Sequence, residues 1–192
     1  MASRGVFTPA AAGRGTRGRP VDMSEIEDFP EDIRLIDRSE LTSKVVRGVA
    51  EYWDRHRLEG VLPPKTAIDP FALKPWLPYL SISEAYGDPF RMRYRLVGTE
   101  VVRVTQSDFT GRWLHESGWP ADIIDINTAL YRRVWERRLP LFGLSTVLWD
   151  GRVDFRFEWG VLPFSTDGTT VTHFLGVDDY STMTRPKRSK LR

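Results

Sequence analysis

The chain has 192 residues, of which 41% are hydrophobic and 12% aromatic, and this suits one folded domain with terminal tails. It has no cysteine, which excludes disulfides, thiolate metal sites, thiol nucleophiles and cysteine-adduct photochemistry. The net charge of +2 is unevenly spread: basic residues gather at both ends, eight acids lie within residues 21–40, and residues 41–184 are nearly neutral. This argues against nucleic-acid binding, which usually needs a basic face on the folded domain.

The same features predict where the domain begins and ends. We expect residues 1–38 to be a disordered or loosely docked N-terminal tail, residues 39–181 to be the domain, and residues 182–192 to be a basic C-terminal tail. Within the first tail, only residues 32–37 (DIRLID) look able to dock on the domain. No apolar run approaches the roughly 20 residues that span a bilayer. We therefore expect no membrane association and a cytoplasmic location.

A first helix is predicted over residues 41–57, with Ser39 as its N-cap and Gly60 shortly after its end. Its apolar stripe is broad enough to cover more than one packing face. We interpret the stripe as a candidate interface with a second copy or a signalling partner. The alternative is that residues 63–79 of the same chain cover it and that the protein is monomeric. The stripe consists of Leu41, Val45, Val46, Val49, Tyr52 and Trp53.

Short turns over residues 69–79 lead to two strands, at residues 80–85 and 90–97. In the second strand, apolar residues alternate with Arg91, Arg93 and Arg95, which places the arginines together on one face of a sheet. Such a row offers bidentate donors to an anionic ligand or nucleotide. The favoured interpretation is a solvated outer face that pairs with acids on neighbouring strands, such as Glu158.

The rest of the chain predicts one short helix, one long helix and three more strands. A short helical segment follows Gly98, and a long helix covers residues 120–138. Strands at residues 141–149 and 152–163 form a hairpin through Asp150-Gly151, and a last strand covers residues 172–177. The order predicts an α+β fold with a five-stranded antiparallel sheet and helices on one face.

Several segments make the chain resemble the PAS superfamily, and in particular the short stand-alone PAS proteins of alphaproteobacteria. The resemblance implies a PAS-like fold and a sensory or protein-interaction module that acts through a partner. It is carried by residues 52–55 (YWDR), 62–80 (LPPKTAIDPFALKPWLPYL), 93–99 (RYRLVGT), 108–112 (DFTGR) and 162–168 (LPFSTDG).

Catalytic and metal-binding patterns are missing from the sequence. His56, His115 and His173 are far apart and none lies at metal-type spacing from carboxylates. The serines have no G-x-S-x-G context, and no phosphate-binding glycine loop follows a strand. We therefore expect no enzyme activity and no metal site. Some PAS relatives bind haem or flavin, but neither cofactor is favoured here.

We conclude from the sequence that the chain is a non-catalytic sensory module that binds a small ligand or a protein partner. The alternative is an interaction or dimerisation scaffold with a filled core and no ligand. A ligand pocket would be lined by aromatic side chains on the inner sheet face and after the glycine turn. The candidates are Tyr94, Trp113, Phe155, Phe157 and Trp159.

Overall fold

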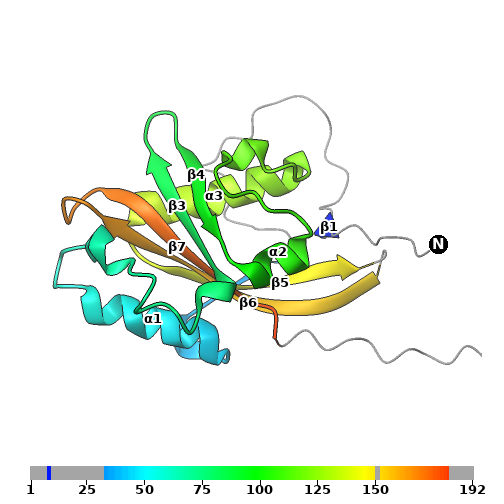
Figure 1. Cartoon of the computed structure of the whole chain (residues 1–192), viewed down its shortest axis with the longest axis horizontal. Coiled ribbons are helices and arrows are strands. Elements are labelled where there is room, and N and C mark those ends of the chain that lie inside the picture. Colours follow the sequence, from blue (N-terminus) through cyan, green and yellow to red (C-terminus); the bar gives the residue numbers. More distant parts are fainter. Residues whose placement is uncertain (1–7, 10–32, 150–151, 182–192) are drawn as a thin grey trace, which may run out of the picture.

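The computed structural model describes residues 8–9, 33–149 and 152–181 (Figure 1). They form one antiparallel sheet of seven strands in the order β1-β5-β6-β7-β3-β4, with β2 also paired to β5. The strands are β1 Thr8–Pro9, β2 Ile33–Ile36, β3 Leu80–Tyr86, β4 Arg91–Val97, β5 Leu141–Trp149, β6 Arg152–Ser165 and β7 Val171–Asp179. The helices are α1 Lys44–His56, α2 Thr99–Thr105 and α3 Ala121–Arg137.

The five predicted strands correspond to β3 to β7, so the α+β class and the antiparallel sheet are confirmed. The Asp150-Gly151 turn lies outside the described residues, but Trp149 pairs with Arg152 as the predicted hairpin requires. Two short strands were not predicted. β1 and β2 both pair with β5, and β2 comes from the segment of the N-terminal tail that looked able to dock.

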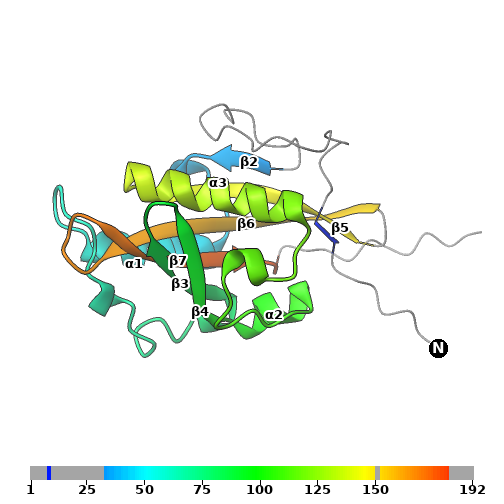
Figure 2. The same ribbon diagram turned by 90° about the horizontal axis from the view of Figure 1, so that it is seen from above.

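Helices cover both faces of the sheet, whereas the sequence predicted helices on one face. In Figures 1 and 2, α1 lies on one side of the sheet and α3 on the other. The alternation of side chains along β7 explains this. Phe174 points toward α3, where its ring lies 5.1 Å from that of Tyr131. Asp179 points the other way and accepts a 2.6 Å hydrogen bond from Ser43 at the start of α1.

The N-cap of α1 is Ser43 rather than the predicted Ser39. The Ser43 hydroxyl accepts hydrogen bonds from the backbone N–H groups of Val45 and Val46, at 3.1 and 3.0 Å. Ser39 lies one turn earlier, in a 3-10 helix that Asp37 caps. The buried carboxylate of Glu158 explains why Ser43 and not Ser39 is the N-cap. It accepts a hydrogen bond of 2.9 Å from the backbone N–H of Ser43 and fixes the chain at that residue.

The apolar stripe of α1 is buried inside the chain, which corrects our interpretation of it as a free interface. Leu41, Val46, Val49, Tyr52 and Trp53 are all buried, and only Val45 is partly exposed. Their cover comes from two places. The Tyr52 hydroxyl donates to the carbonyl of Ala67 at 2.7 Å, and the Trp53 indole donates to the carbonyl of Pro163 at 2.7 Å. The alternative, in which residues 63–79 cover the stripe, is therefore right in part. Strands β6 and β7 cover the rest of it.

Both edges of the sheet are partly covered by other segments. At one edge, residues 111–113 run beside β4: the N–H of Tyr94 donates to Arg112 and the N–H of Gly111 donates to Tyr94, both at 2.9 Å. Gly111 has a φ of +81°, which glycine adopts without strain and which turns the chain back toward β4. At the other edge, β1 and β2 pair with successive parts of β5.

Among the described residues, no helix is long and apolar enough to cross a membrane.

Candidate functional site

A cavity of about 130 Å³ lies between the sheet and the helices α2 and α3. Strands β3 to β7 contribute one wall, and the inward face of α3 contributes much of the other. Most of its lining is apolar and aromatic. The aromatic lining residues are Tyr94, Phe109, Trp119, Tyr131, Phe157, Trp159 and Tyr180. The polar ones are Ser81, Thr105, Asn127, Ser145, Thr146 and Asp178.

Three of the five predicted pocket residues line this cavity, namely Tyr94, Phe157 and Trp159. The side chain of Phe155 lies outside the described residues. Trp113 does not line the cavity: it pairs with Arg93 across the edge of β4, and this pairing turns its ring toward the arginine face. There the guanidinium of Arg91 lies 4.9 Å from the centre of the ring.

Sequence reasoning missed several lining residues. The sequence predicts an inward-facing core stripe on α3 at Ile123, Ile126, Leu130 and Val134. The first three of these residues line the cavity, as does Tyr131, which the stripe does not include. From the sequence, Asp178 and Asp179 form an acid pair at a strand end, where solvated charge is the default expectation. The period of two along β7 separates them, with Asp178 at the cavity and Asp179 at the start of α1.

Asp178 is the charged group of the cavity. Its side chain is partly buried and lines the cavity. Burial raises the pKa of its carboxyl from 3.8 to about 7, because a low-dielectric environment disfavours the charged form. Within the described part of the chain, neither a hydrogen bond nor a nearby positive charge offsets this shift.

The tyrosines around Asp178 stay neutral. Burial raises the pKa of Tyr94, Tyr131 and Tyr180, and the nearby Asp178 charge raises it further. The indole N–H of Trp119 is buried and has no hydrogen-bond partner among the described residues. In contrast, the Trp159 indole donates to the hydroxyl of Ser145 at 2.8 Å. The cavity wall therefore combines neutral aromatic surfaces with one carboxyl and one unused donor.

The lining does not fit haem or flavin. None of the three histidines lines the cavity: His115 is exposed and stacks on Trp113, His56 bonds to the carbonyl of Tyr52, and His173 points to the other face of the sheet. The cavity is also smaller than the roughly 300–1,000 Å³ typical of sites for drug-sized ligands. Within the described ranges, no group of three or more histidines and acids is placed to hold a metal ion.

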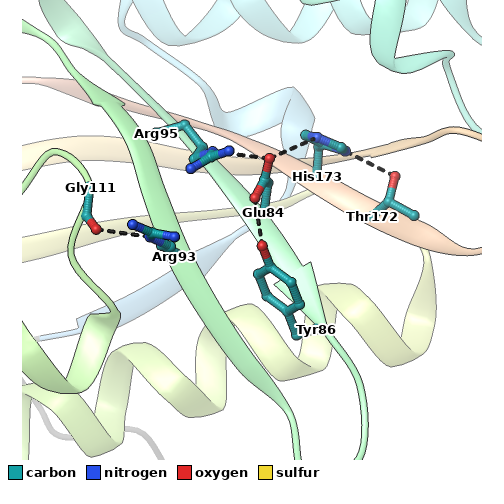
Figure 3. Close-up of polar contacts among 7 residues, drawn as sticks. All are labelled: Glu84, Tyr86, Arg93, Arg95, Gly111, Thr172 and His173. Atoms are coloured by element: carbon teal, nitrogen blue, oxygen red, sulfur yellow. Dashed lines mark hydrogen bonds and ion pairs between the residues drawn. The ribbon is translucent and has the colours of Figure 1, made fainter.

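The arginine face of β4 belongs to a separate polar cluster on the other side of the sheet (Figure 3). At its centre, Glu84 pairs with Arg95 at 3.0 Å and accepts a 2.7 Å hydrogen bond from the Tyr86 hydroxyl. Burial tends to raise the pKa of Glu84, but these two partners lower it below its ordinary value. Arg93 donates to the carbonyl of Gly111 at 2.9 Å. The predicted pairing with a neighbouring acid is thus present, with Glu84 in the role that we gave to Glu158.

His173 completes this cluster as a neutral group. Burial lowers its pKa, as does the charge of Lys65, although Glu84 lies 3.9 Å from its Nε2 atom and opposes the shift. Its Nδ1 atom lies 2.9 Å from the Thr172 hydroxyl. The cluster therefore links β3, β4 and β7 through contacts between neighbouring strands. We accordingly take the cavity, and not this cluster, as the candidate functional site.

The match to a protein family agrees with this architecture. The family model described as PAS domain matches residues 41–178, nearly all of the sheet and its three helices. The chain is also similar to the structure of an RNA-binding light-oxygen-voltage receptor, at 15% identity and a TM-score of 0.38. That match covers 95% of this chain and 40% of the receptor, so this chain spans well under half of that protein. No curated protein matches the sequence. The family match over most of its length shows that this chain belongs to the PAS domain family.

Proposed function

We propose that this PAS domain is a non-catalytic sensor that binds a small molecule in its cavity and passes the signal to a protein partner. The observation that supports this most is the cavity itself, about 130 Å³ of space behind an aromatic wall. Interiors are normally packed to crystal density, so an opening of this size with polar groups in its wall is typical of a binding site. The alternative of a scaffold with a filled core receives less support for the same reason.

The cavity chemistry favours binding over catalysis. Its one carboxyl, on Asp178, is surrounded by neutral phenols and has no histidine or hydroxyl nucleophile paired with it among the described lining residues. General acid–base or nucleophilic catalysis needs two such groups within hydrogen-bond reach. We therefore assign the lining residues to recognition.

A short route connects the cavity to α1. Asp178 lines the cavity, and the next residue, Asp179, accepts the hydrogen bond from Ser43 that begins α1 on the opposite face. A ligand that shifts β7 at Asp178 would thus also move the start of α1. We propose that the partner responds to the position of this helix, whose buried stripe moves with the sheet.

Filling the cavity tests the proposal. Ile126→Trp adds a large ring at the cavity wall, while Ile124→Trp makes the same change on α3 at a partly buried residue that does not line the cavity. The measurement is the melting temperature of each full-length protein with a library of monocyclic compounds, together with denaturing mass spectrometry of the purified proteins. We expect compounds that stabilise the wild type and Ile124→Trp but not Ile126→Trp. Equal responses of all three proteins, or no response of the wild type to any compound, would contradict the proposal.

A further inference from the structure

The charge of the cavity wall restricts the class of ligand. Among the lining residues that the structure describes, Asp178 is the one with an ordinarily ionised side chain, and none is a lysine, an arginine or a histidine. An anionic ligand would find no positive partner here and would face the Asp178 carboxylate. Transfer of an unpaired anion into such an apolar site costs several kcal/mol. The wall therefore selects neutral or positively charged ligands.

Among the described residues, no hydrogen bond and no positive charge stabilises the ionised Asp178 carboxyl, whose pKa is shifted by burial alone. The titratable groups that face it are Tyr94 from β4, Tyr131 from α3 and Tyr180 just after β7, and all three are neutral phenols. Buried acids are normally paired or hydrogen-bonded, since an unpaired carboxylate in an apolar site is costly. A ligand that brings an ammonium group to this position would provide the missing partner.

The aromatic wall suits the same kind of ligand. Tyr94, Phe109 and Trp119 pack edge to face, with ring centres 4.5 Å apart for the first pair and 5.0 Å for the second. Farther along the wall, the rings of Phe157 and Tyr180 lie 4.8 Å apart. Aromatic faces attract a desolvated cation and also pack well against an apolar ring. The aromatic side chains therefore provide surfaces for both the ammonium group and the ring of an aromatic or cyclic amine.

The size of the cavity limits the body of the ligand to about one ring. A dry engineered cavity of about 150 Å³ binds benzene, and this cavity is close to that volume at about 130 Å³. We propose that the cavity binds a small monocyclic amine in its protonated form, with the ammonium group paired to Asp178 and the ring between the aromatic side chains. This inference rests on the proposed ligand-binding function and adds the chemical class of the ligand.

Three probes of nearly equal shape test the ligand class: benzylamine, benzyl alcohol and benzoate. The experiment is calorimetric titration of the full-length protein with each probe. We expect benzylamine to bind at least about tenfold more tightly than benzyl alcohol, the size of an effect near 1.4 kcal/mol, and benzoate not to bind. Asp178→Asn keeps the shape of the side chain and removes its charge, so it should abolish the preference for benzylamine while benzyl alcohol still binds. Glu51→Gln, which removes an exposed carboxylate on α1, should leave the preference unchanged.

The dependence on pH adds a readout that a purely structural role of Asp178 would not give. Because the pKa of Asp178 lies near 7, its ionised fraction rises about tenfold between pH 6 and pH 8. The affinity for benzylamine should rise by about the same factor in that range, and the affinity for benzyl alcohol should not rise. Benzyl alcohol retained by Asp178→Asn shows that the cavity of the variant is intact.

Two kinds of failure remain distinguishable. Equal binding of benzyl alcohol and benzylamine, tight binding of benzoate, or an unchanged preference in Asp178→Asn overturns the amine class and leaves the ligand-binding function standing. If neither these probes nor the compound library distinguishes the wild type from Ile126→Trp, the ligand-binding function fails together with the inference.

Discussion

Ser43 and Asp179 join the start of α1 to the end of β7 through a hydrogen bond of 2.6 Å between hydroxyl and carboxylate. Both side chains are buried. The same hydroxyl accepts two backbone N–H groups of the first turn of α1, and Asp179 also accepts the N–H of Ser181 at 2.9 Å. The helix and the strand therefore share a buried polar contact that lies one residue away from the cavity.

Ser43→Ala should destabilise the protein by about 2–3 kcal/mol. The loss of an N-cap costs about 1 kcal/mol, and the loss of a hydrogen bond to a buried carboxylate costs about 1.5–3 kcal/mol. Denaturant unfolding of the full-length protein measures the difference. Ser39→Ala is the control, since Ser39 is exposed and its removal should change stability by less than about 0.5 kcal/mol. A larger effect of Ser39→Ala than of Ser43→Ala would contradict the position of the cap.

Trp159→Ala should cost about 3–5 kcal/mol, the usual range for removal of a buried Trp. Trp159 is only 5% exposed, and it fits beside Gly143, where an added Cβ would lie 2.3 Å from the indole ring. Arg156→Ala, at an exposed position of the same strand, should cost less than about 1 kcal/mol. Denaturant midpoints compare the two variants. Similar losses from both would mean that the faces of β6 are assigned wrongly.

Asp178 should make the stability of the ligand-free protein depend on pH. Its pKa is about 7 in the folded protein and near 3.8 once it is exposed, so between these values the unfolded chain releases a proton that the folded protein keeps. The Asp178 contribution to stability is therefore full below about pH 4, falls as the pH rises toward 7, and is constant above 7.

The comparison of wild type with Asp178→Asn isolates this group, because the other titrating groups cancel in the difference. We expect the variant to gain stability relative to wild type from pH 4.5 to pH 7, by at most about 1.4 kcal/mol per pH unit, and then to keep a constant advantage. The measurement is the free energy of unfolding of both proteins across that range. A difference that does not change with pH would show that Asp178 has an ordinary pKa.

Removal of residues 1–36 should lower the melting temperature by several degrees. The composition of this segment predicts a dispensable tail, but β2 lies within it: Ile36 is buried and Ile33 lines the cavity. Deletion takes β2 from the edge of β5 and exposes that apolar surface. Calorimetry of the truncated and full-length proteins checks this. The comparison is removal of residues 186–192, which leaves every described element in place; an equal melting temperature for both truncations would contradict a structural role of β2.

Most of the sheet and the long helix are predictable because their signals are local. Alternation of side chains identifies β4 and β6, the Asp150-Gly151 pair identifies the hairpin, and a 3.6-residue stripe identifies α3. β2 has only four residues between acidic neighbours, and it becomes a strand because β5 offers an edge more than 100 residues later in the chain. The formation of β2 therefore depends on a tertiary contact that its own local sequence does not reveal.

The cover of α1, its N-cap and the cavity residue Asp178 were less predictable for the same reason: each depends on residues far away in the sequence. A stripe on α1 shows which side of the helix is buried but not which face of the sheet buries it, so its cover by β6 and residues 63–79 could not be read from the helix alone. The choice of Ser43 over Ser39 depends on Glu158, 115 residues away. Asp178 was missed because an acid near a strand end is usually solvated; counting alternate positions back to Phe174 would have placed it inside.

The cover on both edges of the sheet has a consequence for how this protein can associate. An open strand edge is a template for another strand, and it invites β-augmentation by peptides, domain swapping and aggregation. Here residues 111–113 occupy the N–H and carbonyl of Tyr94 on β4, and β1 and β2 occupy much of β5. At these paired positions the backbone is already hydrogen-bonded, so another chain can contact them only through side chains.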